Sequence, residues 1–121
     1  AHASIYDSCV QAIVASQALQ VGVNPSLPPE DRGVANASIN FMDAFWMATT
    51  GGGEALGFKV GIFSEGYSFD AMIINTAATD SNLVIWENMD SVEDVLQKIV
   101  FNARRPNIRT VWVQGALVVG D

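Results

Sequence analysis

The placement of proline and glycine constrains this fold most. Three of the four prolines and two glycines fall within residues 22–37, GVNPSLPPEDRGVANA. Proline fixes φ and lacks a backbone donor, so neither a helix nor an inner strand continues through such a stretch. The pattern predicts a long irregular connection, and connections of this length are commonly mobile or functional.

Before this connection, residues 4–20 carry apolar side chains at helical spacing. Ser4 is the expected N-cap, with Asp7 three positions on in the capping-box slot, and Gly22 ends the helix. The helix is apolar on nearly every side. Such helices are usually buried, so we expect burial here.

After the connection, Asn40 and Asp43 form a second capping signature, and Ile39 is placed as a hydrophobic staple. The three glycines at 51–53 are expected to end this helix, and EALG to add one short further turn. The clearest helix covers about 91–102, where Ser91 is the expected N-cap and Asp94 completes the capping signature.

The strands are predicted from apolar, β-branched runs, with one hairpin turning at Glu65-Gly66 and another at Gln114-Gly115. The run Phe69–Asn75 is apolar on both faces, which favours a central strand. The fold class is therefore α+β, with a helical segment at 1–57 and, at 58–121, strands of a small β domain with one helix. The expected strands are Lys59–Phe63, Phe69–Asn75, Leu83–Trp86 and two runs within 108–119.

Charge excludes two classes of partner. The net charge of −7 comes from 13 acids against 6 bases, and no basic run exceeds Arg104-Arg105. A nucleic-acid surface needs a basic footprint, and an anionic membrane attracts basic segments, so the acidic balance argues against both partners.

No apolar stretch approaches the roughly 20 residues that span a bilayer. The lone Cys9 fits a reducing compartment, so the cytoplasm is expected.

Half of the residues are hydrophobic and only 16% are charged. A small domain struggles to cover that much apolar surface, so we expect an oligomer or a larger body. Trp46, Trp86 and Trp112 are expected to be core aromatics.

The residue inventory contains no complete catalytic set. His2 is the single imidazole and Cys9 the single thiol, so a metal site would have to combine them with Asp7. The alternative is a frayed terminal histidine and a packed cysteine. A nucleophilic dyad meets the same shortage, because it also requires His2 as the base.

Other polar clusters have structural explanations. The glycines of TTGGGEALG lack the P-loop lysine and follow a helix rather than a strand. Arg104-Arg105 follows a helix, whose negative C-terminal end it can complement. The remaining candidate acids sit in turns or at strand ends, where solvated side chains are ordinary: Glu30, Asp31, Glu65 and Asp70.

Three stretches carry a family resemblance. They are ATTGGGEALG at 48–57, the pattern G-x-F-x-x-G-x-x-F-D-A at 61–71, and LQKIVFNARRPNIRTVWVQG at 96–115. With their order along the chain, they resemble the C-terminal quarter to third of guanine deaminases, in the amidohydrolase superfamily. The resemblance runs from about Ser4 to Val119.

The resemblance implies a metal-bearing (β/α)₈ barrel and a small β-sandwich domain built from both chain ends. Residues 4–20 and 41–56 match the last barrel helices, and 59–75 and 108–119 match strands of the small domain. The helix at 91–102 matches the one before the last strands. Asp70 matches an acid that the family uses structurally.

The family's zinc ligands, proton shuttle and guanine contacts lie upstream of the matched segment. The resemblance therefore implies no catalytic, cofactor-binding or metal residue in this chain, and zinc only in the parent enzyme. The chain is expected to be a fragment of a zinc hydrolase that converts guanine to xanthine and ammonia. The fragment alone is expected to be inactive, and its expected partner is the missing barrel or further copies of the chain. The alternative is a stand-alone, non-catalytic interaction module that buries the 4–20 helix in a homodimer.

Overall fold

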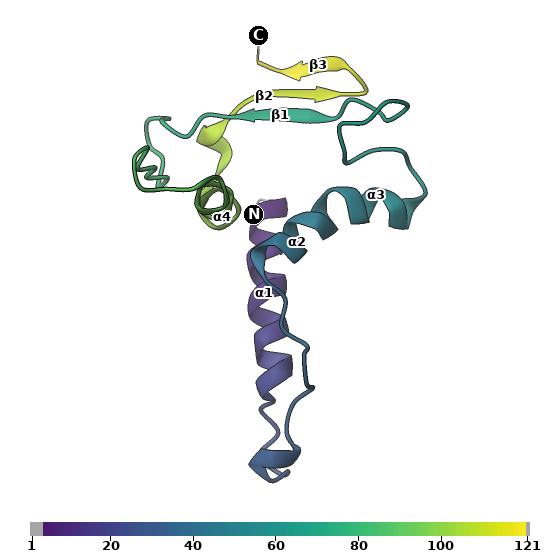
Figure 1. The fold of residues 1–121 in the computed structure, drawn as a ribbon, viewed down its shortest axis with the longest axis vertical. Helices are drawn as coiled ribbons and strands as arrows, with labels where there is room; N and C mark the ends of the chain where they lie inside the picture. The colour runs from purple at the N-terminus through teal and green to yellow at the C-terminus, as the bar shows by residue number, and fades with distance from the viewer. Residues whose placement is uncertain (1–3, 121) are drawn as a thin grey trace.

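The computed structural model describes residues 4–120 and confirms the α+β class. The helices and a small antiparallel sheet occupy separate layers (Figure 1). The helices are α1 (Ile5–Val21), α2 (Phe41–Ala48), α3 (Thr50–Leu56) and α4 (Val92–Asn102), with short 3₁₀ turns at Pro29–Asp31 and Arg105–Asn107. The strands are β1 (Ala71–Ile74), β2 (Ile108–Val113) and β3 (Ala116–Val119).

Helix α1 begins after Ser4 and ends at Gly22, as predicted. The predicted capping box is wrong, because the Ser4 side chain makes no capping bond. Asp7 instead pairs with Arg104, whose Nη2 lies 3.0 Å from its Oδ1. The expectation of a helix buried on every side is also wrong. Its buried residues are Tyr6, Cys9 and Ile13, all in the first nine positions.

Residues 22–37 form the predicted irregular connection, which folds back along α1. The backbone N–H of Val34 donates to the Leu19 carbonyl at 3.0 Å. Gly33 has a φ of +83° and lies so close to Gln20 that a Cβ would overlap the Gln20 carbonyl. In Figure 1 the far half of α1 and this loop project together from the rest of the molecule, as an arm.

Helices α2 and α3 meet at a break on Thr49. The capping box of α2 is confirmed, with the Asp43 N–H 2.9 Å from Asn40 Oδ1 and the Asn40 N–H 3.1 Å from Asp43 Oδ2. The predicted ending at the three glycines is wrong, since they lie inside α3. The helix breaks earlier, where the Thr49 hydroxyl donates to the Phe45 carbonyl at 2.8 Å and φ is −121° with ψ −97°.

The sheet has the order β1-β2-β3, with both pairs antiparallel. Ala71 lies opposite Trp112, which lies opposite Leu117 on its other side. The hairpin turn at Gln114-Gly115 is confirmed, and Gln114 takes a positive φ of 51°. Within residues 4–120, β2 is the central strand and β1 an edge. The prediction of a central strand at 69–75 is therefore wrong.

The segment Lys59–Phe63 is not a strand, so the hairpin expected there is wrong, although the turn at Glu65–Gly66 is present. The Gly61 carbonyl accepts a hydrogen bond from the Thr50 hydroxyl at 3.0 Å. The Ser68 N–H donates to the Lys59 carbonyl at 2.7 Å. Backbone groups bonded in this way are not free for a ladder, so the segment is a loop against the start of α3.

Leu83–Trp86 is likewise not a strand. Side chains from later in the chain take its backbone groups. Lys98 Nζ donates to the Val84 carbonyl at 2.9 Å, and the Trp86 N–H donates to Asp90 Oδ2 at 2.7 Å. The local β propensity is real, but these polar partners leave no row of groups for pairing.

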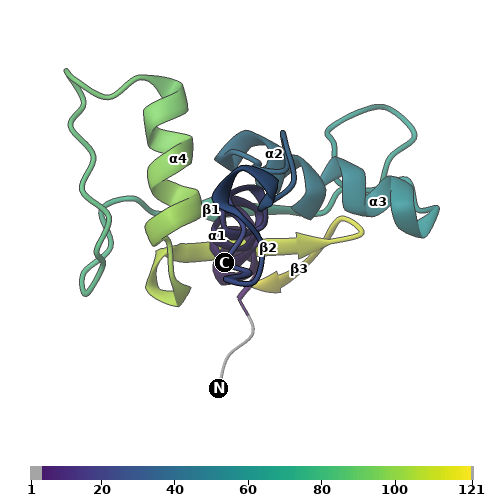
Figure 2. The ribbon, with the colours of Figure 1, turned by 90° about the horizontal axis from the view of Figure 1, so that it is seen from below.

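The buried residues form two small clusters between helices and at the sheet. In Figure 2, α4 lies beside α1 and α2. One cluster joins Cys9, Ile13, Ala44 and Val100, and the other joins Tyr6, Leu83 and Ala103.

Two of the three tryptophans are more than half exposed, Trp46 at 52% and Trp86 at 60%, so the expectation of core aromatics is wrong for them.

Candidate functional site

In the stretch 61–75, the Asp70 carboxylate holds the backbone of a neighbouring turn in place and is not free to act as a reactive group. Asp70 Oδ1 accepts hydrogen bonds from the Gln114 N–H at 2.8 Å and the Ser68 hydroxyl at 2.9 Å. These bonds tie the β2–β3 turn to the approach into β1. Glu65 is exposed in its turn, and Glu30 and Asp31 are exposed in the 3₁₀ turn of the arm. The predicted turn acids therefore lie in separate segments.

Of the three candidate metal ligands His2, Asp7 and Cys9, the Asp7 and Cys9 side chains contact different partners. His2 lies outside the described residues. Cys9 Sγ faces the Ala44 carbonyl at 3.7 Å, inside the helical cluster. Asp7 faces the Arg104 guanidinium instead.

The donor groups of residues 4–120 do not fit a zinc ion. No three His, Cys, Asp or Glu side chains in that range are grouped closely enough to hold a metal. Burial raises the pKa of the Cys9 thiol, whereas a ligand or nucleophile needs the thiolate. Burial, followed by the nearby Cys9, likewise raises the pKa of the Tyr6 hydroxyl, which donates to Met72 Sδ at 3.4 Å. Both shifts disfavour the reactive, charged form.

The glycine-rich stretch serves close packing. A Cβ on Gly53 would overlap the Val60 carbonyl, so only glycine permits the loop after α3 to run this close. The Phe58 N–H donates to the Gly53 carbonyl at 3.0 Å. Since α3 is preceded by α2 and not by a strand, the geometry differs from a phosphate-binding loop.

Arg104 complements the end of α4, as predicted. Its Nη1 donates to the Ala103 carbonyl at 2.7 Å and to the Phe101 carbonyl at 3.4 Å. These carbonyls belong to the negative end of the helix dipole. With Asp7 also in contact, this guanidinium is engaged within the chain.

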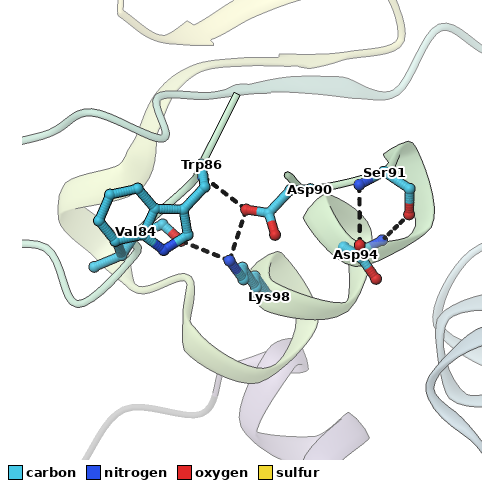
Figure 3. Close-up of polar contacts among 6 residues, drawn as sticks. All are labelled: Val84, Trp86, Asp90, Ser91, Asp94 and Lys98. Atoms are coloured by element: carbon cyan, nitrogen blue, oxygen red, sulfur yellow. Dashed lines mark hydrogen bonds and ion pairs between the residues drawn. The ribbon is translucent and has the colours of Figure 1, made fainter. Parts of the chain in front are cut away.

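The sequence reasoning missed a polar link between α4 and the loop before it (Figure 3). Lys98 Nζ lies 2.6 Å from Asp90 Oδ2, which also accepts from the Trp86 N–H. The Lys98 hydrogen bond, then the Trp86 bond, lower the pKa of the Asp90 carboxyl. The signal was available, since Lys98 stands two helical turns beyond the Ser91 N-cap, on the side of Asp90.

The same figure shows the capping box of α4, which was predicted. The Asp94 N–H donates to Ser91 Oγ at 3.1 Å, and the Ser91 N–H donates to Asp94 Oδ2 at 2.9 Å. The two motifs leave Lys98, Asp90 and Asp94 with partners inside the chain. None of them is positioned as a free acid or base.

A further polar residue, Asn107, was not singled out from the sequence. Its side chain is fully buried and donates to the Asn75 carbonyl at 3.0 Å and to Ser81 Oγ at 2.7 Å. Its Oδ1 accepts from the Arg104 N–H at 3.0 Å. This amide joins the end of β1, the loop that follows and the start of β2.

An open groove of about 540 Å³ lies between α1 and the start of α2. Two of its polar groups are already bonded, since Gln20 Oε1 accepts from the Ser38 N–H and Asn40 is in its capping box. The groove contains one ionisable group, Asp43, which is the other half of that box. It is lined by Gln17, Gln20, Val21, Ser38, Ile39, Asn40 and Asp43.

Residues 7–118 match the amidohydrolase family, and the chain belongs to that family. Among curated relatives it is similar to the guanine deaminase of Homo sapiens, at 36% identity over 91 residues. A second relative is the 5-methylthioadenosine/S-adenosylhomocysteine deaminase of Pyrococcus abyssi, at 34% identity over 79 residues. These matches cover 71% and 65% of this chain but 20% and 17% of the relatives.

The fold also resembles a crystal structure of the guanine deaminase from C. acetobutylicum with guanine bound in its active site. The TM-score is 0.67 and the identity 30%, over 95% of this chain and 24% of that one. The chain thus spans about a sixth to a quarter of the length of the proteins that it resembles. Within residues 4–120, no helix has both the length and the apolar character needed to cross a membrane.

Proposed function

We propose that this chain is a structural segment of a guanine deaminase-like zinc amidohydrolase, whose reaction converts guanine and water to xanthine and ammonia. The observation that carries the proposal is the likeness, over 95% of the chain, to a guanine deaminase crystallised with guanine. The similarity to the human guanine deaminase over 91 residues supports the same substrate.

The proposed role of the chain is to support the enzyme, not to perform its chemistry. Helices α1 to α3 correspond in this proposal to the last helices of a barrel, and the sheet with α4 to part of a small β-sandwich domain. The polar side chains that drew attention, Asp70, Asp90 and Asn107, are bonded to backbone or to other side chains. The zinc ligands and the groups that bind guanine would belong to the rest of the enzyme.

Guanine is favoured over other rings by the comparisons. The human guanine deaminase matches 71% of the chain at 36% identity, whereas the P. abyssi relative, whose name gives a different substrate, matches 65% at 34%. The cytoplasm is proposed as the compartment, because a single cysteine in 121 residues fits a reducing environment.

A direct test uses the pure 121-residue chain. We expect no conversion of guanine to xanthine in an ultraviolet assay, and less than stoichiometric zinc by elemental analysis after dialysis. Guanine turnover by the pure chain, or one tightly held zinc ion per chain, overturns the proposed structural role.

The second test reads the genomic DNA on both sides of the coding segment. We expect an open frame that continues upstream with a His-x-His pair, two further histidines and an aspartate. A start codon directly before Ala1, with no such frame nearby, contradicts the proposal and favours a stand-alone interaction module.

A further inference from the structure

We draw no further inference here: the strongest candidate, the open groove between α1 and the start of α2, carries nothing further, because Gln20, Asn40 and Asp43 in its wall are already hydrogen-bonded within the chain and nothing in the structure shows what covers it.

Discussion

The side-chain amide of Asn107 donates to the carbonyl of Asn75 across 3.0 Å, linking residues that are 32 positions apart in the chain. Asn107 is fully buried, and its other bonds reach Ser81 and Arg104. A buried amide with all of these partners holds three chain segments in one arrangement, since each partner would otherwise be left unsatisfied.

Asn107→Ala is expected to lower the free energy of unfolding by about 2–3 kcal/mol, because it leaves buried donors and acceptors without partners and opens a cavity. Urea denaturation followed by circular dichroism measures the change. Asn102→Ala, at an exposed position near the end of α4, is the control and should alter stability by less than about 0.5 kcal/mol. Equal stability of Asn107→Ala and the parent chain contradicts this role.

Gly53→Ala is expected to destabilise the chain although alanine favours helices by about 1 kcal/mol over glycine. The added methyl group would overlap the Val60 carbonyl, so the loop after α3 must move. Thermal unfolding measures the effect, with Glu54→Ala on the exposed side of α3 as the control. A higher Tm for Gly53→Ala would show that the loop after α3 can move away from the added methyl group without loss of stability.

The Asp90–Lys98 pair is expected to make the free energy of unfolding depend on pH in the acidic range. The hydrogen bond from Lys98 holds the folded pKa of Asp90 below its ordinary 3.8. A depressed carboxyl pKa stabilises the fold above the unfolded value, and that stabilisation is lost as the pH falls through the folded value.

Asp90→Asn should therefore be less stable than the parent chain at pH 7, and the difference should shrink as the pH falls below 3.8. Urea denaturation at a series of pH values measures it. Glu87→Gln removes a carboxylate from the same loop and is the control. A difference that is unchanged between pH 7 and pH 3 would assign the effect to something other than this titration.

The Cys9 thiol is expected to react slowly with a disulfide reagent. It is buried, and burial raises its pKa, so both access and the thiolate fraction are reduced. The rate at pH 8 should be at least about tenfold below that of a free thiol and should rise when urea unfolds the chain. A double variant, Ser8→Cys with Cys9→Ala, moves the thiol to an exposed neighbouring position and should react rapidly. Fast reaction of the parent Cys9 would contradict its burial.

The features that were predictable from sequence are those determined within a few residues. The boxes Asn40–Asp43 and Ser91–Asp94 and the turn at Gln114-Gly115 formed as expected, since each depends on residues within one turn. The box at Ser4 failed because Asp7 found a partner, Arg104, nearly a hundred positions away.

The two missing strands failed for a related reason. The Val84 carbonyl is taken by Lys98, and the Gly61 carbonyl by Thr50, each more than ten residues distant. The β propensity of a segment describes how well its residues suit a strand. It does not reveal whether the backbone groups of that segment are already hydrogen-bonded to side chains from distant parts of the sequence. The absence of a reactive cluster among the described residues follows from the same engagement of polar groups within the chain.

The close approach of Gly33 to Gln20 brings the two ends of the 23–32 segment together. A segment closed at its base can be lengthened, shortened or exchanged without altering the path of the chain on either side. The tip of the arm is thus a natural insertion point, where a reporter or an affinity tag can be carried at a distance from both buried clusters.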